Sequence, residues 1–206
     1  MKALLLAADA RSVATASAMV KRGGIVAYPT DTVYGLGCDP FSADAVGRLV
    51  EAKARESKPI PVICASEGDA AGLVELGPRA LEIARKYWPG AMTIVAPLKV
   101  EVPTPLDQGT GWLGVRVPDD EIALALAGEC GGRITGTSAN LSGQPSSRSA
   151  GDVFVSLGNR IDAILDGGAR GGTESTVVKV DGEAVEVLRR GAVAFEPGIT
   201  RERLDR

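Results

Sequence analysis

The chain has 206 residues, with 23 basic and 26 acidic side chains and no histidine. Its net charge of −3 provides no overall basic field that would attract nucleic acid or an anionic membrane, so any anion-binding surface must be local. Without histidine, the chain cannot use a Ser-His-Asp or Cys-His mechanism or a histidine-ligated metal. The length fits a single domain, which we expect to span residues 1–206.

Apolar runs typical of strands alternate with helical periodicity along the chain. The strand-like runs lie at residues 3–8, 24–28, 60–65, 91–98, 113–117, 133–136, 161–165, 175–180 and 184–188. The helical patterns cover residues 11–21, 42–54, 78–87, 119–130 and 148–157. Asp181-Gly182 predicts a hairpin between the last two strands. This alternation predicts an α/β domain built around one twisted mixed sheet with flanking helices.

Two features bear on the compartment in which the protein works. The first apolar run, residues 3–8, is shorter than the apolar region of a signal peptide and far shorter than a membrane span. Cys38, Cys64 and Cys130 lack the paired spacing of a zinc site or a disulfide framework. We therefore expect a cytoplasmic protein without a membrane segment, in which Cys64 and Cys130 are small core residues.

The standard nucleotide-binding loops are absent from the sequence. No P-loop pattern occurs, and Gly35-Leu36-Gly37, which we interpret as a turn, is followed by Pro40 where a dinucleotide fingerprint carries its third glycine. Ser138 lacks the second glycine of a nucleophile elbow. A bound nucleotide would need another arrangement of donors.

The stretch YPTDTVYGLG, residues 28–37, carries two threonines two positions apart. In an extended segment, Thr30 and Thr32 would present both hydroxyls on one face, whereas Asp31 would point the other way. The simpler interpretation is that two β-branched residues extend a strand. Both interpretations stay open from these residues alone.

A basic cluster lies in EAKARESKPIP, at the end of a helical pattern. Residues two apart on a helix do not face each other, so Lys53 and Arg55 can bind one anion only if the helix ends near Ala54. Such a pair suits a polyphosphate, and its loss should then impair polyphosphate binding with little change in stability. The alternative is a solvated helix end whose cations complement the helix dipole.

The stretch TSANLSGQPS offers hydroxyl and amide groups from Ser138, Asn140 and Ser146 for binding a ligand. The alternative is an ordinary turn, since Ser, Asn, Gly and Pro are common turn residues. Trp88 in YWPGAMTIV is expected to be a core or turn aromatic, with base stacking as the minority interpretation.

Seven motifs occur in one order: YPTDTVYGLG, KAR with KPIPV, WPGAMT, GVRVP, TSANLSGQPS, TESTVV and LRRG. In this order they closely resemble the YrdC-like threonylcarbamoyl-AMP synthase family, from about residue 20 to residue 191. The resemblance implies the YrdC-like fold, a twisted mixed sheet with a concave basic cavity in a single-domain form. It also implies synthesis of threonylcarbamoyl-adenylate and pyrophosphate from L-threonine, bicarbonate and ATP, for the threonylcarbamoyladenosine modification of tRNA.

The resemblance also assigns roles to individual residues. It implies that L-threonine is bound by Thr30, Thr32, Arg116 and Ser175. It implies that ATP is bound by Lys53, Arg55, Lys58, Ser138, Asn140, Ser146 and Arg189, with Lys53 and Arg55 as the catalytic pair. Mg²⁺ would accompany ATP. Contact with the tRNA threonylcarbamoyl-transferase machinery would be transient, and direct tRNA binding weak or absent.

The sequence departs from the family pattern at three places. Glu56 replaces the usual proline after Arg55, Ile63 stands near the place of a histidine, and Arg190 replaces the proline of Arg-Pro-Gly. We expect Ile63 to remove one contact to threonine. Two other functions stay open, an RNA-binding or ribosome-associated module and a paralogous carbamoyl-transfer enzyme.

Overall fold

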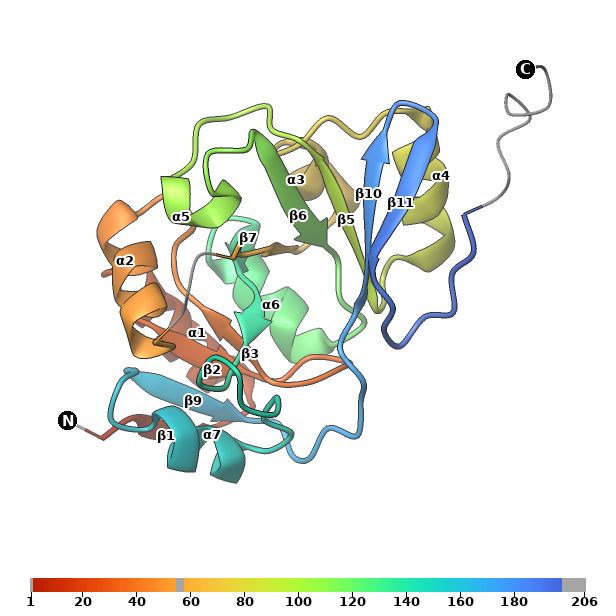
Figure 1. The fold of residues 1–206 in the computed structure, drawn as a ribbon. Helices are drawn as coiled ribbons and strands as arrows, with labels where there is room; N and C mark the ends of the chain where they lie inside the picture. Colours follow the sequence, from red (N-terminus) through yellow and green to blue (C-terminus); the bar gives the residue numbers. More distant parts are fainter. Residues whose placement is uncertain (1, 55–57, 198–206) are drawn as a thin grey trace, which may run out of the picture.

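A computed structural model describes residues 2–54 and 58–197. Within these residues the strands form two sheets, which Figure 1 shows side by side with helices between and around them. The five-stranded sheet has the order β1 (Leu4–Ala7), β9 (Ala163–Asp166), β2 (Val26–Tyr28), β3 (Gly35–Gly37), β8 (Thr137–Ser138). The six-stranded sheet has the order β11 (Ala184–Arg189), β10 (Thr176–Asp181), β5 (Met92–Pro97), β6 (Trp112–Arg116), β4 (Val62–Cys64), β7 (Arg133–Thr135).

Both sheets are mixed. In the first sheet, β9 pairs in parallel with β1 and β2, and β3 pairs antiparallel with β2 and β8. In the second sheet, the hairpin of β10 and β11 turns at Gly182, whose φ of 58° suits a glycine. β10 runs parallel to β5, while β5 and β6 are antiparallel. The long connection from β9 to β10 therefore carries the chain from one sheet to the other (Figure 1).

Side-chain caps begin most of the helices. The helices are α1 (Ala10–Val20), α2 (Ala43–Ala52), α3 (Glu67–Ala71), α4 (Pro78–Tyr87), α5 (Thr104–Asp107), α6 (Glu121–Glu129) and α7 (Ala150–Leu157). The capping side chains accept backbone N–H groups of the first turn and belong to Asp9, Ser42, Ser66, Asp120 and Ser149. Each cap pairs donors that would otherwise lack a helical partner.

The apolar core joins the two sheets through helices α1 and α6. Val13 of α1 and Leu126 of α6 share one buried cluster with Tyr28 of the first sheet and Ile134 of the second. A separate cluster packs α4 against one face of the six-stranded sheet, with Met92 among its buried residues. The opposite face of that sheet is left to form a cavity, described below.

The α/β class and the expected strands and helices are confirmed, with ends shifted by a few residues. Two sheets replace the one that we expected, and β3, β8, α3 and α5 were not predicted. The interpretation of Gly35 to Gly37 as a turn is wrong, because these residues form β3. Among the helices that the described residues form, none is long and apolar enough to cross a membrane.

Candidate active site

A cavity of about 1150 Å³ lies over one face of the six-stranded sheet. Alternate residues of its strands line the cavity, as in Thr93 and Val95 of β5, or Trp112, Gly114 and Arg116 of β6. Side chains of a strand point alternately to opposite faces, so these residues share the face that α4 leaves uncovered. The remaining walls come from the segment after β2, the end of α2 and the segment after β8.

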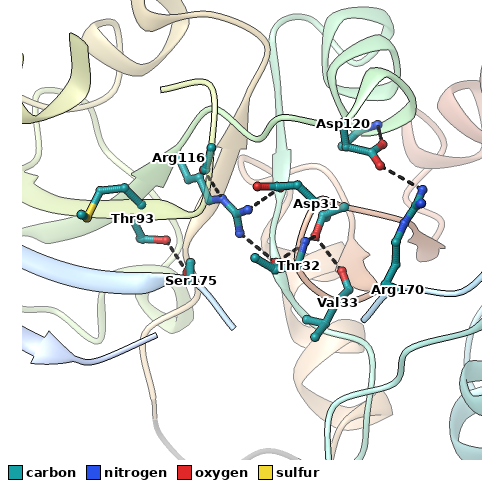
Figure 2. A network of polar contacts seen from close by, with 12 residues as sticks. Asp31, Thr32, Val33, Thr93, Arg116, Asp120, Arg170 and Ser175 are labelled. Atoms are coloured by element: carbon teal, nitrogen blue, oxygen red, sulfur yellow. Dashed lines mark hydrogen bonds and ion pairs between the residues drawn. The ribbon is translucent and has the colours of Figure 1, made fainter. Parts of the chain in front are cut away.

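Arg116 lies at the end of β6 and is buried, with 5% of its surface exposed. Its Nε donates to the carbonyl of Gly90 at 2.8 Å, and its Nη1 donates to Thr32 Oγ1 at 3.1 Å. Its Nη2 forms an ion pair with Asp31, as Figure 2 shows. Burial lowers the pKa of Arg116, whereas the Asp31 carboxylate opposes that shift. These contacts fix the direction of the guanidinium group.

Thr30 and Thr32 place their hydroxyls together, which was one of the two interpretations left open, and neither residue belongs to a strand. The two Oγ1 atoms are 3.0 Å apart, and Thr30 Oγ1 donates to the Val33 carbonyl at 2.6 Å. Residues 29–34 form the connection between β2 and β3. The expectation that Asp31 points away from the threonines is wrong, because Asp31 and Thr32 contact the same guanidinium group (Figure 2).

Ser175 and Arg189 also line the cavity, and they contact each other. Ser175 Oγ lies 2.8 Å from Thr93 Oγ1, a hydrogen bond drawn in Figure 2. Arg189 donates to both oxygens of Ser175, through Nε to the carbonyl at 3.1 Å and through Nη2 to Oγ at 3.1 Å. A residue expected to bind threonine and one expected to bind ATP are therefore in direct contact.

Lys53 ends helix α2 and points inward. The helix stops at Ala52, Lys53 is its C-cap and Ala54 has a φ of 47°, so the helix ends where the sequence required. Lys53 is 1% exposed, which contradicts a solvated helix end for this residue. Its Nζ donates to the carbonyl of Asn140 at 2.8 Å and to that of Ser138. Lys53 thus fixes the segment that carries two of the predicted ATP ligands.

The segment after β8 is held by its own polar groups. Asn140 Nδ2 donates to the carbonyls of Leu141 at 2.8 Å and Gln144 at 2.7 Å. Asn140 Oδ1 is buried and has no partner among the described residues, although Asn140 lines the cavity. A buried amide oxygen without a partner is unusual in a folded protein, and here a bound donor could satisfy it.

The described residues that line the cavity include five basic and two acidic side chains. The basic residues are Lys53, Lys58, Arg116, Lys179 and Arg189, and the acidic ones are Glu174 and Glu186. Lys179 lies over the Trp112 ring at 4.0 Å, which was not foreseen. In residues 2–54 and 58–197, no group of three carboxylate or thiol side chains could hold a metal ion.

The cavity brings together most of the residues that the sequence pointed to. It is lined by Thr30, Thr32, Lys53, Lys58, Arg116, Ser138, Asn140, Ser175 and Arg189. Ser146 is not among the lining residues, but its hydroxyl contacts Glu174, which lines the cavity. Arg55 and Glu56 lie outside the described residues. Trp88 is partly buried against the core and donates to the Met92 carbonyl, in agreement with its predicted role.

Ile63 and Gly136 form a complementary pair at the cavity wall. A Cβ atom at Gly136 would lie 2.5 Å from Ile63 Cγ1, so the isoleucine occupies the space beside the glycine. Ile63 is buried and lies in register with Arg116 on the neighbouring strand. An apolar wall therefore stands beside Arg116 where the family pattern has an imidazole.

Sequence reasoning missed three polar residues of the site. Asp31, Thr93 and Glu174 each hold a residue to which a substrate role was assigned, namely Arg116, Ser175 and Arg189. All three residues lie within the quoted motifs, so their positions were visible. Their partners are far away in the sequence, and no local pattern indicates those pairings.

Comparison with known proteins identifies related chains. The family described as "Sua5_yciO_yrdC: Telomere recombination" matches residues 18–191. A threonylcarbamoyl-AMP synthase of Bacillus subtilis is 39% identical over 197 residues, covering 94% of this chain and 55% of that protein. A threonylcarbamoyl-AMP synthase of Halorhodospira halophila is 40% identical over 177 residues, covering 85% of this chain and 92% of that protein.

The structure resembles that of P. abyssi Sua5 complexed with L-threonine. The two agree with a TM-score of 0.86 at 34% identity, over 93% of this chain and 58% of the other. The chain thus spans little more than half the length of the Bacillus subtilis and P. abyssi proteins and nearly all of the Halorhodospira halophila protein.

Proposed function

Because the chain belongs to the Sua5/YciO/YrdC family, we propose that it is a threonylcarbamoyl-AMP synthase. Its substrates are L-threonine, bicarbonate and ATP, and its products are threonylcarbamoyl-adenylate, pyrophosphate and water. The observation that carries this proposal is the direct contact of Ser175 with Arg189 within a cavity that also contains Thr32, Arg116 and Lys53. Residues expected to bind an amino acid and residues expected to bind a nucleotide share one site.

The amino-acid side of the cavity suits a threonine zwitterion. Arg116 supplies a fixed guanidinium group for a carboxylate, and Thr32 and Ser175 supply hydroxyls nearby. Arg116 already has acceptors on three of its nitrogens, so a threonine carboxylate would share it with Asp31 and Thr32. The similar protein P. abyssi Sua5 was solved in complex with L-threonine, which supports threonine as a substrate of this chain.

The chemistry needs positioning more than it needs a protein nucleophile. The threonine amine forms a carbamate with carbon dioxide or bicarbonate, and a carbamate oxygen then attacks the α-phosphorus of ATP while pyrophosphate leaves. Both nucleophile and leaving group belong to the substrates, which fits a chain without histidine. Orientation of reactants can supply about 7–11 kcal/mol, and fixed cations stabilise the charge that develops on phosphate oxygens.

Mg²⁺ would accompany the nucleotide and would neutralise part of its phosphate charge. Lys53, Lys58 and Arg189 add positive charge on the protein side, and the segment from Ser138 to Ser146 supplies hydroxyl and amide groups. The activated threonylcarbamoyl group would then pass, through transient contact, to the tRNA threonylcarbamoyl-transferase machinery.

Pyrophosphate release by purified protein tests the proposal. We expect release from ATP only when threonine and bicarbonate are both present. Serine should be used at least about fivefold less efficiently, because the pocket gains about 1 kcal/mol or more from the γ-methyl group. Equal rates with serine would reject this specificity, and release that ignores threonine would point to a paralogous enzyme.

A gel-shift titration with RNA at physiological salt tests the alternative of a nucleic-acid module. We expect no shift at micromolar protein, since the net charge is −3. Tight binding that ATP competes away would favour the RNA module over the synthase.

A further inference from the structure

Glu174 links two residues to which the family resemblance assigns ATP. Ser146 Oγ donates to Glu174 Oε1 at 2.5 Å, and Arg189 Nη1 forms an ion pair with Oε2. The two contacts come from separate parts of the chain, since Ser146 belongs to the segment after β8 and Arg189 ends β11. The carboxylate of Glu174 therefore accepts a hydrogen bond from each of the two residues.

The backbone around Glu174 is fixed by packing. Its carbonyl accepts the N–H of Ala192 at 2.8 Å, and a Cβ atom at Gly191 would lie 2.3 Å from that same carbonyl oxygen. Only a glycine at position 191 permits this approach. The carboxylate is thus presented to the cavity from an anchored main chain.

A carboxylate and a phosphate oxygen accept hydrogen bonds from the same donors in similar geometry. The other nitrogens of Arg189 are directed at Ser175, so Nη1 is the donor that Glu174 holds. A polyphosphate that binds Ser146 and Arg189 must therefore replace Glu174 on both residues.

We propose that Glu174 is a positioning residue for ATP, which holds Ser146 and Arg189 in place and yields both donors to the polyphosphate. This inference rests on the proposed function, because that function identifies the ligand as ATP. The exchange keeps both donors hydrogen-bonded before and after binding, so neither hydroxyl nor guanidinium has to reorganise. Its cost is that ATP binds less tightly than it would without a competing carboxylate.

Solvent weakens the competition between the Glu174 carboxylate and the polyphosphate for Arg189. The side chains of Arg189 and Glu174 are 45% and 35% exposed, so water and salt screen their attraction. We therefore expect a change in affinity of about three- to tenfold when the carboxylate is neutralised.

The variant that tests the inference is Glu174→Gln, which keeps the shape and removes the charge. Two controls match it. Glu186→Gln removes a carboxylate from the same cavity without breaking an Arg189 contact, and Glu196→Gln breaks the 3.3 Å pair with Arg190. Calorimetry with a non-hydrolysable ATP analogue and Mg²⁺ measures binding without turnover.

We expect Glu174→Gln to lower the Kd about three- to tenfold, and each control variant to change it less than twofold. In an Arg189→Ala background, Glu174→Gln should change Kd less than twofold, since the donor is gone. Equal or weaker binding by Glu174→Gln, an equal gain in Glu186→Gln, or an undiminished gain without Arg189 overturns the inference.

Steady-state kinetics separate this role from a structural one. Glu174→Gln should lower the KM for ATP and leave kcat within twofold, because it strengthens ground-state and transition-state binding alike. A fall in kcat together with the thermal midpoint indicates a structural role and overturns the inference. If the wild type binds the analogue but releases no pyrophosphate with threonine, the proposed function fails. The comparison of Glu174→Gln with the wild type still decides whether Glu174 competes with the nucleotide. Absence of binding by wild type and variant alike overturns both.

Discussion

Buried cations define the site at the scale of single residues. Arg116 and Lys53 are 5% and 1% exposed, and each is surrounded by acceptors fixed in the protein. Arg116 donates hydrogen bonds to a carbonyl, a hydroxyl and a carboxylate of other residues. Lys53 donates to two main-chain carbonyls. Burial of a charge is costly unless such groups replace water. The result is positive charge held in a fixed direction, which can stabilise phosphate or carboxylate groups without reorganisation.

Lys53→Met should destabilise the protein, contrary to the expectation from sequence that stability would scarcely change. The substitution leaves the carbonyls of Ser138 and Asn140 without their ammonium partner, at a cost of about 1–3 kcal/mol. Urea unfolding measures this difference, and the KM for ATP should rise because the segment from Ser138 loosens. Lys21→Met is the matched control, since Lys21 is an exposed C-cap of α1. Equal stability of the two variants would refute the structural role of Lys53.

At the scale of elements, close packing of β2 and β3 shapes the wall of the site. Tyr28 pairs with Gly35 across the two strands, and its hydroxyl donates to the Thr135 carbonyl at 2.8 Å. A Cβ atom at Gly35 would lie 2.9 Å from the Tyr28 ring, and one at Gly37 would lie 2.6 Å from Ile134. The two glycines therefore allow a short strand to lie flat between an aromatic ring and the second sheet.

Gly37→Ala should destabilise the protein by about 1–3 kcal/mol, because the new methyl group overlaps Ile134 and Tyr28 in a packed core. Gly47→Ala is a control for which we expect a change in stability of the opposite sign. Gly47 lies within α2 with open space around its would-be Cβ, so alanine should stabilise by about 0.5–1 kcal/mol. Thermal unfolding of the two variants in parallel should give shifts of opposite sign. A neutral Gly37→Ala would mean that the core relaxes around the methyl group.

At the scale of the whole molecule, the described residues form three apolar clusters, which hold the two sheets and their helices together. Cys38 and Cys64 are buried in the largest cluster, and both are free thiols. Burial raises the pKa of each thiol to about 12 from its ordinary value of 9.0. In the unfolded chain these thiols ionise near pH 9, so ionisation favours unfolding above that pH.

The free energy of unfolding should therefore fall as the pH rises from about 9 towards 12. A raised native pKa stabilises the fold fully below the unfolded value and loses that contribution as the pH rises through the native value. Each buried thiol adds a slope of at most about 1.4 kcal/mol per pH unit in this window. Urea unfolding under reducing conditions from pH 7.5 to 10.5 should show a shallower fall in Cys64→Ala than in wild type. Identical slopes would contradict the prediction.

Local physical chemistry allowed much of this protein to be predicted from its sequence. Period-two and period-3.6 apolar patterns gave the strands and helices, since they depend on neighbours within one element. The end of α2 near Ala54 and the acidic start of α6 followed from the same local rules. The ordered motifs indicated which residues would meet in one site, and the cavity gathers nearly all of those that the structure describes.

Only the tertiary structure decided which residues far apart in the sequence contact each other. The division of the strands into two sheets, the strand from Gly35 to Gly37 and the pairs Asp31 with Arg116 and Ser146 with Glu174 all depend on distant segments. Asp31 and Arg116 are 85 positions apart, and Ser146 and Glu174 are 28 apart. A local pattern reports the backbone preference and the buried face of a segment. It carries no information on which distant carboxylate will satisfy a buried guanidinium group, because that choice is made by the packing of the whole fold.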